Sequence, residues 1–173
     1  MLAHLLAALQ QHSVYVPVRD GTRIAVDVYL PDGHVAGARH PALLELTRYG
    51  RAREDARTGA PVPSIDALDR HFLAHDYAVV KIDVRGAGAS FGSRTSEYGR
   101  EEVRDGRDLV AWVVAQEWCD GNVGAYGTSY SGTTAELLAA AGHPAVKAVV
   151  IGWSDFDGYR SPIWPYGIYA ESL

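Results

Sequence analysis

One serine of this chain lies in a run of small residues that could present it as a nucleophile. The run reads Gly127-Thr128-Ser129-Tyr130-Ser131-Gly132. It follows an apolar stretch at 123–126 and precedes a small-residue stretch at 133–141, so it is predicted to join a strand to a helix. A nucleophilic serine needs a sharp, strained turn at such a junction, with small neighbours where strand and helix nearly touch. The chemistry that this arrangement predicts is attack on a carbonyl carbon to form a covalent acyl intermediate.

The spacing of the glycines departs from the strict pattern of such a turn, which is called a nucleophile elbow. That pattern is G-x-S-x-G, whereas the fifth position here is Ser131 and the glycine, Gly132, comes one residue later. A turn rich in serine and glycine that only connects a strand to a helix would have the same composition. The six residues alone therefore leave both interpretations open.

A second glycine-rich loop, at 83–92, follows a predicted strand. Its glycines are spaced G-x-G-x-x-x-G, which is not the G-x-G-x-x-G of a dinucleotide site, and no Gly-Lys-Ser/Thr follows for a phosphate loop. We therefore expect no cofactor, and we expect Asp83 and Arg85 to be partners that shape this loop, a structural rather than a catalytic role. Asp105 and Asp108 are interpreted as charges on the solvated face, or near the start, of the following helix.

The partners that a catalytic serine requires are harder to place. Behind a nucleophile elbow the triad acid and then the histidine follow the serine in the chain. His143 is the single histidine after Ser129, and it lies at the predicted end of the next helix, about one helix length from the hydroxyl. The alternative to a general base is a histidine that faces solvent or the last helical carbonyls. Asp155, after the last predicted strand, is the candidate acid.

Alternating strands and helices are predicted to position these residues. Residues 14–18 and 23–30 form an expected antiparallel hairpin around Asp20-Gly21. Further strands are expected at 42–46, 77–82, 123–126 and 146–151, and helices at 65–75, 101–117 and 133–141. This order predicts an α/β fold whose mostly parallel sheet is flanked by helices, with the chemistry at the carboxyl ends of the strands. The polar stretch 51–63 is the one expected flexible insertion.

Composition excludes several classes of partner. The 173 residues predict one domain, and 21 acidic and 16 basic residues, a net charge of −5, are spread without runs. We therefore expect neither nucleic acid nor anionic lipid as a partner. Cys119 is the single cysteine, which excludes an internal disulfide and a cysteine-ligated metal site and favours the cytoplasm. No metal is expected.

The N-terminal stretch predicts a short amphipathic helix rather than an export signal. No Lys or Arg precedes Arg19, and the apolar run is short. Four leucines share one helical face: Leu2, Leu5, Leu6 and Leu9. We expect this helix over residues 1–13 and the catalytic domain over residues 14–173. No stretch approaches the ~18 consecutive apolar residues of a membrane span, so no membrane partner is expected.

Three blocks of the chain resemble the cocaine esterase and Xaa-Pro dipeptidyl-peptidase family of serine hydrolases. WCDGNVGAYGTSYSG at 118–132 resembles the family's W-x-[DN]-G-x-V-G-x-x-G-x-S-Y-x-G, in which the last glycine stands where Gly132 does. DVRGAGASFG at 83–92 resembles its D-x-R-G-x-G-x-S-x-G loop, and LTRYGR at 46–51 resembles the loop after its third strand. The blocks stand in the family's order, and the resemblance covers about residues 14–169. It implies the α/β-hydrolase fold.

The resemblance also implies roles for individual residues. Ser129 would be the nucleophile, and the backbone N–H of Tyr130 would be one donor to the oxyanion that forms. In the family a tyrosine hydroxyl after the third strand is the other donor, and Tyr49 matches it, although Arg48 stands where the family often has proline. An aromatic ring packed at a strand end is the alternative interpretation of Tyr49.

In this family the triad acid and histidine, a helical cap and a C-terminal β-sandwich all come later than residue 173. The resemblance therefore implies a partial catalytic domain, truncated after about the sixth strand. The tail resembles the segment that leads toward the cap, where family members line the acyl pocket. The candidate substrate-binding residues there are Trp153, Trp164 and Tyr166, and an aromatic-rich buried tail is the alternative.

The predicted function is hydrolysis of ester or amide bonds, Xaa-Pro peptide bonds among them, through an acyl-enzyme on Ser129. The expected substrate is a small ester or a short peptide, and this chain alone is expected to be incomplete as an enzyme. The alternative is a non-catalytic remnant or a fragment that binds a partner chain. The strand at 146–151 is apolar on both faces and is expected at a sheet edge. Such an edge favours self-association or pairing with a complementary downstream chain.

Overall fold

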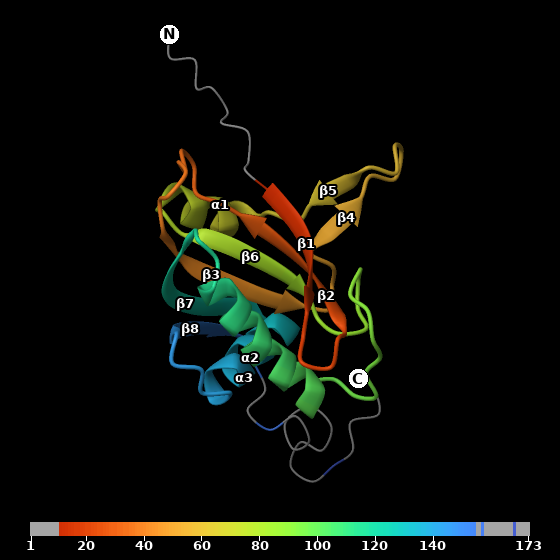
Figure 1. The fold of residues 1–173 in the computed structure, drawn as a ribbon. Coiled ribbons are helices and arrows are strands. Elements are labelled where there is room, and N and C mark those ends of the chain that lie inside the picture. The colour runs from red at the N-terminus through yellow and green to blue at the C-terminus, as the bar shows by residue number, and fades with distance from the viewer. Residues whose placement is uncertain (1–10, 155–156, 158–167, 169–173) are drawn as a thin grey trace.

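The structure, a computed structural model, describes residues 11–154, 157 and 168 of the 173-residue chain (Figure 1). Residues 1–10 of the predicted N-terminal helix lie outside the described residues. Residues 11–13 were expected to close that helix, and this expectation is wrong, because they begin strand β1 (Gln11–Pro17). The Ser13 hydroxyl donates a 2.6 Å hydrogen bond to Asp27, which lies opposite it on β2, and this contact holds the register at the start of β1.

Six strands of the described part of the chain form one sheet, in the order β1-β2-β6-β3-β7-β8. β1 and β2 (Arg23–Tyr29) form the predicted antiparallel hairpin, and β2 pairs antiparallel with β6 (Ala78–Asp83). From β6 onward the pairing is parallel, through β3 (His40–Thr47) and β7 (Cys119–Thr128) to β8 (Val146–Gly152). The predicted α/β class, a mostly parallel sheet with an antiparallel N-terminal pair, is confirmed.

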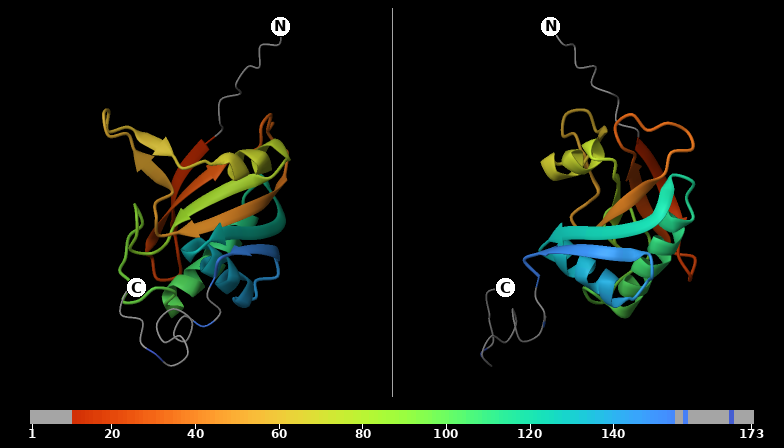
Figure 2. Two further views of the ribbon diagram at one scale, coloured as in Figure 1. Left: turned by 180° about the vertical axis from the view of Figure 1, so that it is seen from behind. Right: turned by 90° about the vertical axis from the view of Figure 1, so that its left-hand side faces the viewer.

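Helices cover both faces of the sheet (Figure 2). α2 (Arg100–Val114) and α3 (Tyr130–Ala140) lie on one face, and α1 (Ala67–Ala74) lies on the other. Strand side chains alternate between the faces. Val80 and Ile82 of β6 therefore enter the large core with α2 and α3, whereas Val79 packs with Tyr29 and Leu73 beneath α1. None of the described helices is long and apolar enough to cross a membrane.

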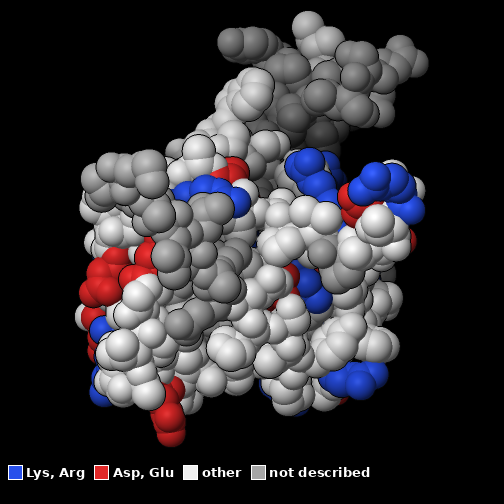
Figure 3. Space-filling model, turned by 90° about the horizontal axis from the view of Figure 1, so that it is seen from above, with Lys and Arg blue, Asp and Glu red and all other residues white. Residues whose placement is uncertain are grey.

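The stretch 51–63, expected to be a flexible insertion, forms a second, two-stranded sheet. β4 (Ala52–Glu54) pairs antiparallel with β5 (Pro61–Pro63). The Asp55 carboxylate closes the turn between them by accepting hydrogen bonds of 2.9 and 2.8 Å from the backbone N–H groups of Arg57 and Thr58. Seen from the end of the molecule from which this hairpin projects, basic and acidic side chains lie interspersed on a largely uncharged surface (Figure 3).

Candidate active site

Ser129 lies at the junction between β7 and α3, at the carboxyl end of the parallel strands. β7 ends at Thr128 and α3 begins at Tyr130, so the serine is the single residue between them. Its backbone has φ 59° and ψ −122°, a conformation that costs a residue with a side chain about 1–3 kcal/mol. Its backbone N–H donates a 2.8 Å hydrogen bond to the carbonyl of Gly152 at the end of β8. The predicted strained turn between strand and helix is present, and the serine is exposed.

Two glycines make this turn possible, which explains why the sixth position of the motif is glycine. A Cβ on Gly127 would lie 2.4 Å from the Cβ and carbonyl carbon of Ser131, closer than real atoms approach. A Cβ on Gly132 would lie 2.4 Å from the carbonyl oxygen of Gly152. Ser131 itself is buried and tolerates its side chain, because its Cβ points into the space that Gly127 leaves. The turn therefore requires glycine at 127 and 132, and a small residue suffices at 131.

Tyr49 lies beside Ser129, two residues after the end of β3. Its hydroxyl is 3.5 Å from the Ser129 Oγ, and its backbone N–H donates a 3.0 Å hydrogen bond to the Thr47 hydroxyl. The Tyr49 side chain is 59% exposed, so it is not packed as a core residue. The hydrogen bond with Ser129 lowers the pKa of Tyr49, and the Arg48 guanidinium and the Tyr130 backbone N–H contribute. The structure thus brings Tyr49, Ser129 and the Tyr130 amide together.

Tyr130 offers its backbone and buries its side chain. As the first residue of α3 its N–H has no partner within the helix, so it is available to a developing negative charge, and the positive end of the helix dipole adds to this. The ring is buried, stacked on Tyr98 with 4.7 Å between centroids. Its hydroxyl accepts a 2.9 Å hydrogen bond from Arg94 and donates one to the buried Glu102. Burial raises the pKa of Glu102, so this side chain favours its protonated form more than an exposed glutamate does.

Two buried aspartates, Asp83 and Asp27, hold the loop that carries Tyr49. The Asp83 carboxylate accepts hydrogen bonds from the backbone N–H of Arg51, at 2.8 Å, and of Ala89, at 2.9 Å. The Arg51 side chain donates a 2.8 Å hydrogen bond to Asp27. Asp83 therefore ties the loop after β3 to the glycine-rich loop after β6, which is the loop-shaping role that its sequence position predicted.

Arg85 pairs with acids outside its own loop and not with Asp83. Its guanidinium binds both carboxylate oxygens of Asp105 at 2.7 Å, and it also contacts Asp20 at 2.8 Å. Arg19 reaches the same Asp105 at 2.8 Å. The interpretation of Asp105 as a solvated helix charge is therefore wrong, since Asp105 is only 3% exposed and two arginines neutralise its carboxylate. Asp108, which pairs with Arg19, keeps a partly exposed side chain.

Sequence reasoning missed a polar cluster on the face of the sheet that α1 covers. Lys81 of β6 pairs with Asp69 of α1 at 2.8 Å and with Glu45 of β3, and the Tyr126 hydroxyl donates to Asp69. Tyr126 stands on β7, three residues before Ser129, so the cluster ties α1 to the strand that carries the serine. A lysine inside the otherwise apolar run at 78–82 was the signal that a buried partner existed, because a buried lysine needs a paired acid.

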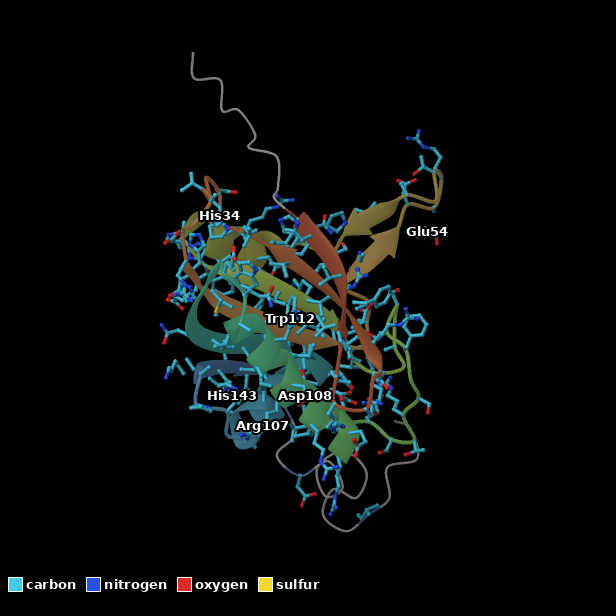
Figure 4. All side chains as sticks on the ribbon, viewed as in Figure 1. His34, Glu54, Arg107, Asp108, Trp112 and His143 are labelled. Atoms are coloured by element: carbon cyan, nitrogen blue, oxygen red, sulfur yellow. The ribbon has the colours of Figure 1, made fainter. Side chains whose placement is uncertain are left out.

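The general base expected of a triad is not among the described residues beside Ser129. His143 lies past the far end of α3, near Arg107, and its Nδ1 accepts a 3.2 Å hydrogen bond from the Ala145 N–H (Figure 4). His34 precedes β3, His40 is its first residue, and His71 and His75 precede β6, so these four histidines lie at the amino ends of the parallel strands. His12 lies on β1. Within the described ranges, no histidine hydrogen-bonds the Ser129 hydroxyl.

Three of the remaining candidate residues cannot be placed. Asp155, Trp164 and Tyr166 lie outside the described residues. Trp153 is described, and it directly follows the Gly152 carbonyl that binds the Ser129 amide. Its side chain is 89% exposed and its φ is 54°, so it stands in the open beside the elbow rather than in the core.

Comparison with known proteins adds the family. The X-Pro dipeptidyl-peptidase (S15 family) profile matches residues 20–172. A Mycobacterium bovis protein designated a serine esterase is 47% identical over 171 residues, which cover 94% of this chain and 27% of that protein. The cocaine esterase of Rhodococcus strain MB1 Bresler is 38% identical over 150 residues, 87% of this chain and 24% of that enzyme. This chain thus spans 27% or less of the length of these two curated relatives.

The fold comparison agrees with the sequence comparison. The crystal structure of an aminopeptidase from a marine-sediment Thaumarchaeota archaeon superposes with a TM-score of 0.73 at 27% sequence identity. The match covers 95% of this chain and 28% of that one. The described sheet therefore has the fold of these hydrolase structures, and the expected α/β-hydrolase fold is confirmed.

Proposed function

Because the chain belongs to the X-Pro dipeptidyl-peptidase (S15) family, we propose that it is the nucleophile-bearing part of a serine hydrolase that cleaves ester or amide bonds through an acyl-enzyme on Ser129. One observation carries this proposal. In a strained and exposed turn, the Ser129 hydroxyl lies 3.5 Å from the Tyr49 hydroxyl, and the next residue, Tyr130, presents its backbone amide at the start of α3. A nucleophile next to two convergent donors is the arrangement that acyl transfer requires.

The reaction follows from these positions. The Ser129 Oγ attacks the substrate carbonyl carbon, its proton passes to a general base, and the carbonyl oxygen becomes an oxyanion. The Tyr130 N–H and the Tyr49 O–H donate to that oxyanion. The tetrahedral intermediate then collapses, the ester or amide bond breaks, and the leaving group takes the proton from the base. Water subsequently attacks the acyl-Ser129 ester and releases the acid.

The substrate class is proposed from the relatives and from the site's surroundings. The relatives are named for esters and for Xaa-Pro peptides, so we propose a small ester or a short peptide as substrate. Trp153, exposed next to the elbow, is proposed to contact the acyl or leaving group, since an exposed aromatic ring beside a nucleophile offers apolar area to a substrate. Trp164 and Tyr166 are proposed as further lining residues, and Asp155 as a candidate acid, on their sequence positions alone.

Steady-state hydrolysis of p-nitrophenyl acetate by the full-length gene product tests the proposal. In Ser129→Ala, turnover should fall to the level that the oxyanion site and substrate binding provide by themselves. That level is about 10³ to 10⁴-fold above the reaction in water. Ser131→Ala is the matched control, because it removes a neighbouring hydroxyl that is buried and has no hydrogen-bond partner among the described residues. Its turnover should equal that of the wild type. Equal turnover in all three proteins would overturn the proposal.

A second candidate function rests on the missing base. Since no histidine among the described residues reaches Ser129, the same scaffold could bind an ester or a partner chain without turning it over. Isothermal titration with a non-hydrolysable phosphonate ester separates the two candidates. Binding by a full-length product that has no measurable turnover would favour the non-catalytic function.

A further inference from the structure

Arg48 places a positive charge between the two tyrosines of the candidate oxyanion site. Its guanidinium carbon lies 5.2 Å from the centre of the Tyr49 ring and 5.1 Å from the centre of the Tyr130 ring. The two rings meet edge to face, with 6.1 Å between centroids and an angle of 72°. A guanidinium at this distance from an aromatic face is attracted by the ring's electrons. The Arg48 guanidinium therefore holds the Tyr49 ring against the ring of Tyr130, the first residue of α3.

A second loop holds the guanidinium in place. Arg48 forms an ion pair with Glu97, in the segment just before α2, and the two side chains are 37% and 42% exposed. The next residue, Tyr98, stacks on the Tyr130 ring from another side, at 4.7 Å. Tyr98 has a φ of 57°, which is rare for a bulky residue and persists only where surrounding contacts fix it. The cluster of Arg48, Tyr49, Glu97, Tyr98 and Tyr130 is thus assembled from three segments of the chain.

The positive charge of Arg48 acts on the Tyr49 hydroxyl. A nearby guanidinium stabilises a negative oxygen relative to a neutral one, so it polarises the O–H bond of Tyr49. The pKa of Tyr49 is accordingly below its usual value, with the hydrogen bond to Ser129 as the largest cause and the hydrogen bond and charge of Arg48 as further causes. A more acidic hydroxyl is a stronger donor to an oxyanion, because charge-assisted hydrogen bonds are shorter and stronger than neutral ones.

We propose that Arg48 is a positioning residue of the hydrolase, whose guanidinium, clamped by Glu97 over the rings of Tyr49 and Tyr130, aims and polarises the Tyr49 hydroxyl toward Ser129. This inference rests on the proposed function and adds a residue to it. It predicts that Arg48 acts on catalysis through Tyr49 and that both the charge and the planar shape of the side chain matter, since only a planar guanidinium can lie against a ring and bind a carboxylate at once.

The first test is a titration of Tyr49 in the 173-residue chain. It is monitored by the difference in ultraviolet absorbance between each protein and its Tyr49→Phe counterpart. The charged and titratable groups around Tyr49 are Arg48 on its own loop, Arg94, Glu97 and Tyr98 before α2, Glu102 on α2, and Tyr130 on α3. Arg48→Gln should raise the pKa of Tyr49 toward its usual value of about 10. Glu97→Gln should change it less, because the cation remains.

The matched control is Arg57→Gln, which removes an exposed arginine on the β4–β5 turn. It should leave the titration of Tyr49 unchanged. If Arg48→Gln moves the titration no more than Arg57→Gln does, the inference is overturned. Where Arg48→Gln fails to fold, Arg48→Lys takes its place, since it keeps the charge and loses the planar contact. A Tyr49 titration in Arg48→Lys equal to that of the wild type would contradict a role for the planar group.

The second test uses turnover of the full-length gene product in a double-mutant cycle. Arg48→Gln should lower kcat about tenfold with little change in KM, as loss of a transition-state interaction does. On a Tyr49→Phe background the same substitution should have no further effect, because the hydroxyl on which it acts is gone. An equal loss on both backgrounds would overturn the role of Arg48 and leave Ser129 catalysis intact. Failure of the proposed function is distinguishable, because turnover would then not depend on Ser129 at all.

Discussion

The backbone amide of Ser129 and the carbonyl of Gly152 are joined by a 2.8 Å hydrogen bond, so the end of β8 fixes the turn at the end of β7. The same carbonyl lies against Gly132, at the start of α3. One peptide group of β8 thus sets both the conformation of the candidate nucleophile and the distance at which the next helix begins. The elbow depends on a strand that is far from it in sequence and adjacent to it in the sheet.

The close approach at Gly132 predicts a large effect of adding one methyl group. In Gly132→Ala the new Cβ would meet the Gly152 carbonyl at 2.4 Å, and α3 would have to move. We expect the free energy of unfolding to fall by about 3 kcal/mol, at the upper end of what overpacking usually costs. Denaturant titration followed by circular dichroism measures it. Gly99→Ala is the control, with a loss of about 1 kcal/mol or less, since its Cβ meets nothing closer than 3.4 Å and only the preference of the helix cap changes.

The strained backbone of Ser129 predicts an unusual order of stabilities. Its φ of 59° with ψ of −122° disfavours any residue that has a Cβ, so Ser129→Gly should be more stable than Ser129→Ala by about 1 kcal/mol. At an ordinary helical position the order is the reverse by a similar amount. Thermal melts of the two variants make the comparison. An alanine variant as stable as the glycine variant would show that the turn is not strained in solution.

Tyr49 as an oxyanion donor predicts both a rate effect and a pH dependence. In the full-length product Tyr49→Phe should lower kcat by about 10²- to 10³-fold, the usual effect of losing one such donor. A phenolate cannot donate, so wild-type kcat should also fall as the pH rises through the pKa of Tyr49, which lies below its ordinary value. The pH profile of Tyr49→Phe should lack this alkaline limb. A limb that is unchanged in the variant would assign it to another group.

The edge of the described sheet predicts self-association of the 173-residue chain. Val150 and Ile151 of β8 are 68% and 42% exposed, and a hollow of about 580 Å³ extends from β8 over β7 toward α1. An exposed parallel edge with apolar side chains recruits further strands or a complementary chain. Light scattering during size-exclusion chromatography should show dimers or larger species, reduced in Val150→Lys. The control is Val35→Lys, which changes an equally exposed valine in a loop, at 67%. A monomer in all three proteins would contradict the prediction.

Much of this architecture could be predicted because it is local in the sequence. The hairpin, the apolar runs of β3, β6 and β8 and the small residues around Ser129 each have a periodicity or a steric reason within a few residues. Boundaries were less predictable where the partner is distant. β7 begins at Cys119 rather than at residue 123, because Cys119 pairs with His40 of β3 before the register shifts. α1 begins at Ala67 rather than at residue 65, because Asp66 and Asp69 form a capping box.

The features that sequence could not predict depend on contacts between distant segments. Asp105 has the same local pattern as an exposed helix acid, and only the meeting of Arg85 and Arg19 at its carboxylate buries it. Arg48 likewise has no local signal, because its role depends on Glu97 and on a ring from α3. Tyr49 was found through a family resemblance rather than through its own neighbours, and its 3.5 Å distance to Ser129 is a property of the folded sheet.

The central claim is that Ser129 becomes acylated, and intact-protein mass spectrometry of the full-length gene product tests it most directly. The protein is mixed with p-nitrophenyl acetate, quenched in acid within the first turnover, and digested for peptide mapping. We predict one acetyl group per protein, on the peptide that contains Ser129, with none on the same peptide of Ser129→Ala and an unchanged amount in Ser131→Ala. An acetyl group that persists in Ser129→Ala, or turnover of the ester with no adduct on Ser129 at any time, would contradict the account.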